Sequence, residues 1–90
     1  MNKDRRKALG SLTEQLDTLK GKLNDIQQEL EGLRDEEQEY YDNMPESFQM
    51  GDKGQAAEEA IGYLDEAATA AGEAESQIDE VMTAIESACE

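Results

Sequence analysis

Apolar residues recur every three or four positions through the first third of the chain. The series is Leu9, Leu12, Leu16, Leu19, Leu23, Ile26, Leu30 and Leu33. This spacing fits the a and d positions of a heptad repeat, which place apolar side chains along one face of a helix that pairs with another. It predicts a helix over about residues 3–42. Ser11 and Glu14 also fit a capping box, which would leave residues 1–10 as a basic arm outside the helix.

A broader apolar stripe follows in the second half of the chain and predicts a second helix over about residues 54–88. Its a and d positions are Ala57, Ala60, Leu64, Ala67, Ala71, Ala74, Ile78, Val81, Ile85 and Ala88. Neighbouring positions add further apolar residues, so the stripe is wider than one partner helix would cover.

Residues 43–53 read as the connection between the two helices. Pro45 disfavours helix at Met44 and ends the first helix near Asp42. Asp52, with Gln55 three residues later, resembles a capping pair that starts the second helix. A connection of this length returns the second helix antiparallel to the first. The predicted fold is therefore all-α, a two-helix antiparallel hairpin of the coiled-coil type.

Size complementarity suggests how the two helices pair. If positions whose numbers sum to about 96 face one another, Leu23, Ile26 and Leu30 oppose small residues of the second helix. Those small residues are Ala74, Ala71 and Ala67. One face of the alanine-rich helix would remain uncovered, so we expect two copies to associate as a homodimeric four-helix bundle.

Composition argues against catalysis. The 90 residues contain no histidine, the commonest general base and zinc ligand. They also contain no glycine-rich phosphate loop and no G-x-S-x-G turn. We predict a single-domain protein that is not an enzyme, with no catalytic, metal-binding or cofactor-binding residues. A single cysteine, Cys89, excludes an internal disulfide. No apolar run approaches the length of a membrane span, so we expect a cytoplasmic protein without membrane contact.

Charge is distributed unevenly along the chain. Residues 1–34 carry seven Lys/Arg and six Asp/Glu, a net of +1, and residues 35–90 carry one and seventeen, a net of −16. Acids in the last turns of a helix oppose its dipole, at about 0.3–1 kcal/mol each, so their accumulation there favours a binding role. The candidate partner-binding acids are Asp35, Glu36, Glu39, Asp42, Glu46, Glu58, Glu59, Asp65 and Glu66.

Aromatic and methionine side chains gather around the connection. Tyr41 and Phe48 are candidate partner-binding residues because aromatic side chains are enriched at interfaces. The alternative is that these residues fold over the end of the helix pair as a plug, and Tyr40, at a d position, is expected in the core. A divalent-cation site built from Asp42, Asn43, Glu46 and Asp52 is conceivable, but these residues lack the spacing of an EF-hand loop, and we predict no metal site there.

The segment Asp35 to Gln49, which contains Tyr-Tyr-Asp-Asn-Met-Pro-Glu-Ser, resembles a group of short acidic proteins encoded by bacteriophages and prophages. Ala57 to Ile61 and Leu64 to Ala67 add to the resemblance, which covers roughly residues 30–88. The resemblance implies a bacterial host cytoplasm, but it brings no assigned activity and no functional residues. Small acidic proteins in that setting often block host defence or nucleic-acid enzymes, which is an analogy at the level of class.

Two functional hypotheses follow. In the first, the acidic surface binds and inhibits a basic protein surface, such as that of a nucleic-acid-binding enzyme, by imitating DNA. The acids lie at roughly one per 5 Å, against about 1.7 Å for duplex DNA, so one chain alone is too sparse a mimic. In the second, the chain is a structural or adaptor coiled coil that binds a partner helix through its alanine-rich face. Direct nucleic-acid binding is not expected, because the only basic run, Lys3 to Lys7, lies in a strongly negative chain.

Overall fold

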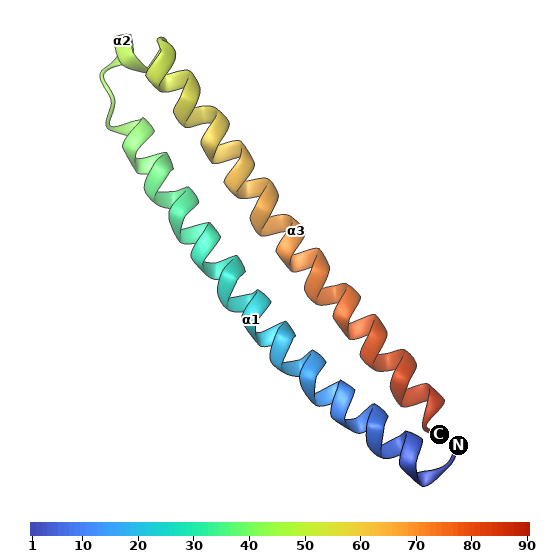
Figure 1. Cartoon of the computed structure of the whole chain (residues 1–90). Coiled ribbons are helices and arrows are strands. Elements are labelled where there is room, and N and C mark those ends of the chain that lie inside the picture. The colour runs from blue at the N-terminus through green and yellow to red at the C-terminus, as the bar shows by residue number, and fades with distance from the viewer.

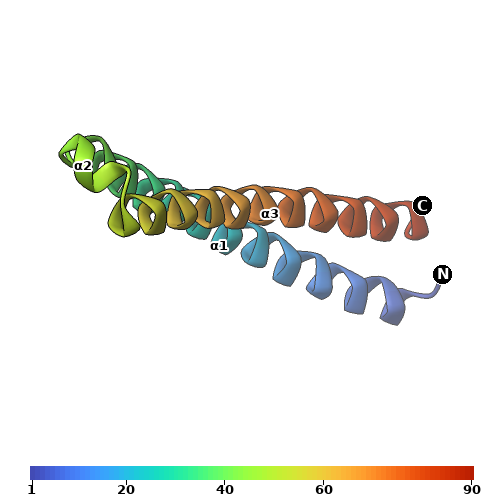
Figure 2. The ribbon, with the colours of Figure 1, turned by 90° about the horizontal axis from the view of Figure 1, so that it is seen from above.

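The computed structural model describes all 90 residues. It contains α1 (Lys3–Asp42), α2 (Glu46–Gln49) and α3 (Asp52–Ala88) and no strand, which confirms the all-α prediction. The two long helices lie side by side and run in opposite directions, with α2 at the end where the chain turns (Figure 1). The molecule measures 68 × 15 × 14 Å. Seen from above, α1 and α3 cross each other, so that their ends lie apart in this view (Figure 2).

Helix α1 begins at Lys3 because the side chain of Asn2 caps it. The Asn2 carboxamide oxygen accepts a hydrogen bond from the backbone N–H of Arg5 at 2.8 Å. Such a bond satisfies one of the free donors that every helix start leaves. Residues 3–10 are thus helical, and Ser11 lies inside the helix rather than at its start.

The turn between the long helices contains one further helical turn, α2, which the sequence did not predict. The carbonyl of Pro45 accepts hydrogen bonds from the N–H groups of Phe48 and Gln49, at 2.9 and 3.1 Å. Gln49 then donates through Nε2 to the carbonyl of Tyr41 at 2.9 Å, which fastens α2 to the end of α1. Helix α3 starts one residue earlier than a cap at Asp52 would give, because Gly51 is the N-cap and Asp52 is the first helical residue.

Gly54 makes the close turn possible. It is buried, and a β-carbon at this position would overlap the backbone of Gln49. Only a residue without a side chain allows α2 to approach α3 this closely.

The observed register differs from the expected one. Hydrogen bonds between α1 and α3 join Lys20 to Asp79, Asn24 to Glu75, Arg34 to Asp65 and Tyr41 to Glu58, pairs whose numbers each sum to 99. The expected sum of about 96 is therefore wrong by three residues, a shift of about 4.5 Å along the axis. In this register, the polar side chains along one side of the helix pair form hydrogen bonds with one another.

The helices are also rotated relative to the expected seam. On α1, the side chains partly covered by α3 include the leucines at every seventh position, Leu9, Leu16, Leu23 and Leu30, and the polar residues Thr13, Lys20, Gln27 and Arg34. The other half of the predicted seam is not covered. Ile26 is 49% exposed instead of packed against Ala71, and Tyr40 is 53% exposed instead of in the core.

The core within one chain is small. Its buried apolar residues are Ala57, Ala68, Ala71 and Ile78, all from α3. Alanines allow the backbones of α1 and α3 to approach each other, but they bury little apolar surface. The two helices are therefore closely spaced where they meet, but the core between them is small.

Candidate interaction surfaces

The polar edge of the molecule is the side of the helix pair on which α1 and α3 exchange hydrogen bonds. It consists of Lys20, Asn24, Arg34 and Tyr41 on α1 and Glu58, Asp65, Glu75 and Asp79 on α3. Lys20 donates to Asp79, Arg34 donates to Asp65, and the Tyr41 hydroxyl donates to Glu58, each at 2.7 Å. Lys20 and Arg34 of α1 thus each form an ion pair with an acid of α3.

These pairs favour one protonation state of each donor. The hydrogen bond to Asp79 raises the pKa of Lys20 above its ordinary value, and the hydrogen bond to Asp65 does the same for the pKa of Arg34. The hydrogen bond to Glu58 raises the pKa of the Tyr41 hydroxyl, so the neutral, donating form is stabilised. The three groups are solvent-accessible, and water screens their contribution to stability.

The polar edge divides the predicted acidic residues of α3 into two kinds. Glu58 and Asp65 lie at the edge and are engaged with Tyr41 and Arg34. Glu59 and Glu66 are exposed on the opposite, outer side of α3, where they border a shallow depression with Gly62 and Tyr63. Only the second kind is free to contact another molecule without breaking a contact within the chain.

The predicted acids of α1 lie on a different face of the molecule. Asp35 contacts the neighbouring Arg34 at 3.3 Å, and Asp42 accepts a hydrogen bond from Gln38 at 3.0 Å. Together with the exposed Glu39, they lie on the side of α1 turned away from α3, since helical periodicity places them opposite the covered positions.

The predicted acidic cluster is thus spread over two outer faces. Glu36 and Glu46 are also exposed, on α1 and at the start of α2. No three acidic or cysteine side chains come close enough together to hold a metal ion.

The two candidate aromatic residues at the turn have different surroundings. Tyr41 is half-buried and its hydroxyl is occupied by Glu58. Phe48 is 50% exposed, with the Lys53 ammonium 5.6 Å from the centre of its ring, a cation–π contact. Phe48 and Lys53 border a concavity of about 330 Å³ that Tyr40, Asn43, Met44 and Pro45 complete. Phe48 is therefore the more accessible of the two candidates.

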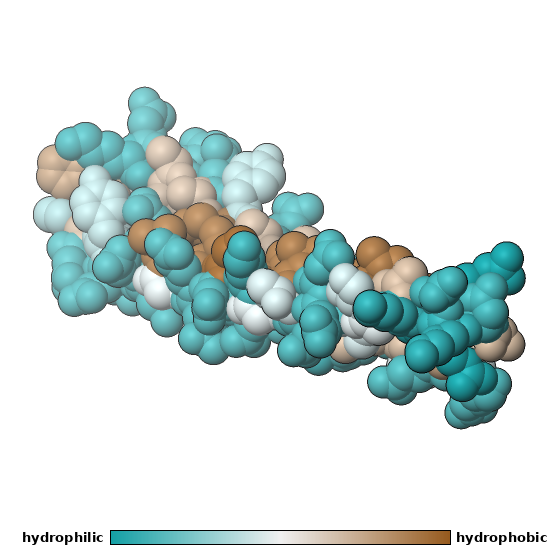
Figure 3. Space-filling view, turned by 60° about the horizontal axis from the view of Figure 1, so that its bottom comes forward, coloured by the Kyte–Doolittle hydropathy of each residue, from teal (hydrophilic) through white to brown (hydrophobic).

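The side opposite the polar edge carries an apolar surface, although its residues occupy heptad positions that predict a place between the two helices. We call it the apolar edge. On α1 it consists of Leu12, Leu19, Ile26, Leu33 and Tyr40, which are 47–53% exposed. On α3 the corresponding column is Ala60, Ala67, Ala74, Val81 and Ala88, in which Val81 is 48% exposed. Figure 3 shows apolar side chains in a band along the molecule, bordered by polar residues.

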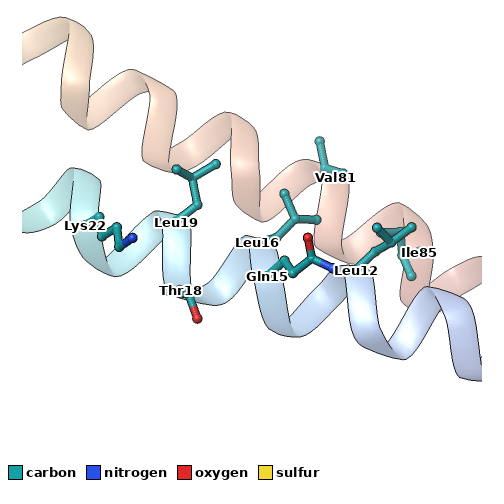
Figure 4. A pocket seen from close by; sticks show the side chains of 8 residues that line it. All are labelled: Leu12, Gln15, Leu16, Thr18, Leu19, Lys22, Val81 and Ile85. Carbon is teal, nitrogen blue, oxygen red and sulfur yellow. The ribbon is translucent and has the colours of Figure 1, made fainter.

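The apolar edge is hollowed near the open end of the helix pair. Leu12, Leu16 and Leu19 of α1 and Val81 and Ile85 of α3 line a groove of about 500 Å³ (Figure 4). Gln15, Thr18 and Lys22 complete its wall on the α1 side. Lys22 borders this groove and forms no ion pair.

One signal in the sequence distinguishes the two edges. Positions 13, 20, 27, 34 and 41 hold polar or tyrosine side chains that can pair with acids, whereas positions 12, 19, 26 and 33 hold only leucine and isoleucine. Lys20, Arg34 and Tyr41 of the polar column have partners on α3. With this column against α3, the purely aliphatic column lies outside. Recognising that pairing requires the register, which one sequence does not contain.

Comparison of the chain with protein-family models, with curated proteins and with solved structures finds no match. The resemblance to acidic phage proteins accordingly stays an expectation. None of the helices combines the length and the apolar character that crossing a membrane requires.

Proposed function

We propose that this protein is a non-enzymatic helical hairpin that binds a basic protein surface through the acidic outer face of α3 and the acids at the turn end of α1. The observation that supports this most directly is the number of acids that lack a cation. Three acids, Asp35, Asp65 and Asp79, form ion pairs. Of the 23 acidic residues, 23 − 3 = 20 have no such partner.

The outer column of α3 is the most regular part of this acidic surface. Glu59, Glu66, Glu73 and Glu80 follow one another at seven-residue intervals and are all exposed. Their spacing of about 10.5 Å is several times larger than the roughly 1.7 Å per charge of duplex DNA. The column is therefore better suited to attracting a basic surface over a distance than to imitating a duplex closely. Attraction of this kind accelerates association.

The partner class is a protein with a basic cleft or patch, for example a nucleic-acid-binding enzyme. If the resemblance to phage proteins holds, that partner is a protein of the bacterial host, and the interaction takes place in the host cytoplasm. Inhibition would then result from occupation of the basic surface. Such binding weakens as salt rises, because exposed charges are screened over about 8–10 Å at physiological ionic strength.

The test compares two variants of equal net charge. Changing Glu59, Glu66, Glu73 and Glu80 to Lys replaces four negative charges by four positive ones and takes the net charge from −15 to −7. The control changes four acids of α1, Asp4, Glu14, Asp17 and Asp25, to Lys. It gives the whole chain the same net charge of −7. Both sets are exposed and leave the ion pairs of Asp65 and Asp79 in place.

The measurement is affinity capture from bacterial lysate, with salt-gradient elution and mass spectrometry. The proposal predicts one dominant basic protein that wild type and control retain and the α3 variant loses, and that moderate salt releases. Equal capture by all three proteins, or no specific capture at all, would reject the acidic surface as a binding site. Circular dichroism of each variant confirms that the helices are retained.

A second candidate function is favoured by the apolar edge. A structural or adaptor protein would use this edge to bind a helix, with the acids serving only to keep the assembly in solution. The helix could belong to a different protein or to a second copy in a four-helix bundle. Because one surface cannot serve both at once, the identity of its occupant decides whether an adaptor function is available.

A further inference from the structure

We propose that the apolar edge is the contact surface for a second copy of this chain. In the complex, the leucine and isoleucine side chains of each α1 lie over the alanine column of the other copy's α3. This inference does not depend on the acidic outer faces, and either proposal can fail without the other.

The exposed area is the first argument. A compact protein of 10.0 kDa exposes about 5,200 Å², whereas this chain exposes 6598 Å². The difference of about 1,400 Å² exceeds the roughly 800 Å² that each partner buries in a standard interface. The chain can therefore lose a full dimer interface and still expose what a folded protein of its mass ordinarily exposes.

The weakness of the core within one chain points the same way. No large side chain is fully buried, and four of the five buried residues are Ala or Gly. A small domain with so little buried apolar surface usually needs oligomerisation or a covalent constraint. The only cysteine, Cys89, is free. A second copy of the chain can bury the exposed apolar surface, and it is available wherever the protein is present.

Charge explains why two copies can meet on this edge although each carries −15. The apolar edge and its flanking positions comprise residues 8, 15, 22, 29 and 36 beside the α1 column and residues 56, 63, 70, 77 and 84 beside the α3 column. Among all these positions only Glu29 and Glu36 are acidic, out of 23 acids in the chain. The other 21 acids lie outside this surface, so docking at the apolar edge keeps most like charges apart.

Side-chain size sets the orientation. The α1 column contains four large aliphatic residues, Leu12, Leu19, Ile26 and Leu33, whereas the α3 column is alanine at every position except Val81. Placing large residues over small ones on both sides keeps the interhelical distances equal, as close packing requires. This arrangement sets each α1 antiparallel to the other copy's α3, and the two turns then lie at the same end.

The test measures the mass of the full chain in solution and of two variants with equal added charge. Leu19 and Ile26 are changed to Lys on the apolar edge, and Ser11 and Gln28 are changed to Lys on exposed positions elsewhere on α1. Analytical ultracentrifugation should give about 20 kDa for the wild type and the control, twice the mass of one 10.0-kDa chain. The edge variant should raise the dissociation constant at least roughly 1,000-fold, since two central anchors are lost from each copy.

Concentration-dependent melting makes the test independent of whether the edge variant folds. The wild-type melting temperature should rise with protein concentration, because association stabilises only the folded state. A monomeric, fully helical wild type with a concentration-independent melting temperature would overturn the proposal, as would an edge variant that remains dimeric. Trimers or tetramers would overturn the two-copy assembly.

Spin labels on Cys89 test the orientation. With the turns at the same end, the two labels should lie roughly 15–30 Å apart, the span of a four-helix bundle with interaxial distances near 10 Å. Separations that approach the 68 Å length of the molecule would show that the copies pack with their turns at opposite ends and would overturn the proposed arrangement.

Discussion

The two edges of the helix pair are built from the same two helices but use different chemistry. At the polar edge, Arg34, Tyr41 and their partners on α3 satisfy one another within one chain. At the apolar edge, Leu19, Ile26 and their neighbours are only partly covered within the chain and remain about half exposed. Polar groups on the first edge specify the register at little net energy. Apolar groups on the second edge would stabilise the protein further if their exposed surface were buried.

This difference implies a division of labour between specificity and stability. The polar edge selects one pairing of α1 with α3, and in the proposed dimer the apolar edge supplies the burial that one chain lacks. Both edges border the same buried line of Ala57, Ala68, Ala71 and Ile78. Changes to one edge should therefore leave a different signature from changes to the other.

The largest effect should come from truncating leucine-sized residues on the two sides of α1. Leu23 is half-covered by α3, whereas Ile26 belongs to the apolar edge. When two copies associate, both side chains are buried, and Leu23→Ala and Ile26→Ala should each reduce the unfolding free energy by about 2–4 kcal/mol. Urea unfolding followed by circular dichroism measures both losses.

A Leu19→Lys background, which blocks association, separates these two positions. There, with sucrose added to keep the helices folded, Leu23→Ala should still destabilise and Ile26→Ala should have almost no effect. Equal losses in this background would mean that Ile26 is packed within one chain and that the two edges do not differ as described.

A smaller loss is expected at the turn, where α2 approaches α3. Gly54→Ala places a methyl group into the backbone of Gln49 and should reduce the unfolding free energy by about 1–3 kcal/mol. The control is Gly62→Ala in the same helix, where a β-carbon meets no atom within 4 Å. That change should stabilise by up to about 1 kcal/mol, the difference in helix propensity. Thermal melting compares them, and a stabilised Gly54→Ala would contradict the observed turn.

The polar edge itself should contribute less. Arg34→Gln removes the hydrogen bonds to Asp65 and Asp35 and should lower the melting temperature slightly, with the difference shrinking in high salt. Lys7→Gln is the matched control, since Lys7 is exposed and forms no ion pair. A salt-independent loss, or the same loss for Lys7→Gln, would show that the Arg34 pair does not contribute electrostatically.

The smallest effect is expected in alkaline solution. The pKa of Tyr41 is raised above its ordinary value of 10.0 by the hydrogen bond to Glu58. Stability from this bond is fully present below the unfolded-state pKa and is lost as pH rises through the higher folded-state pKa. The raised pKa of Lys20, from 10.5, acts in the same direction. Tyr41→Phe should remove part of the stability loss above about pH 10, measured by urea unfolding. An unchanged pH profile would mean that the Tyr41 bond is absent in solution.

The sequence predicted the fold class because heptad spacing over many turns has one physical reading. The aliphatic series from Leu9 to Leu33 indicates a long helix that buries one face. Periodicity alone does not determine which of the two neighbouring apolar columns of α1 faces α3. The series contains both Leu16, which lies against α3, and Leu19, which does not. Register and rotation depend on pairs such as Arg34 with Asp65, and these become visible only when both helices are in place.

The candidate binding surface could be predicted only in part for the same reason. The excess of acids is a property of composition, and the sequence contains it in full. Which acids are free depends on rotation about the helix axis. Glu58 and Glu59 are adjacent in the chain, yet the first accepts a hydrogen bond from Tyr41 and the second is exposed on the outer column. Charge-reversal experiments should therefore use the outer column and leave Glu58 and Asp65 unchanged.

The most direct test of the apolar edge is an isotope-filtered nuclear Overhauser experiment on an equal mixture of labelled and unlabelled chains. We predict cross-peaks between copies from the methyl groups of Leu19, Ile26 and Leu33 to those of Val81, Ala74 and Ala67, respectively, and none across the polar edge. Absence of any contact between copies, or contacts only between residues of the outer faces, would contradict the account.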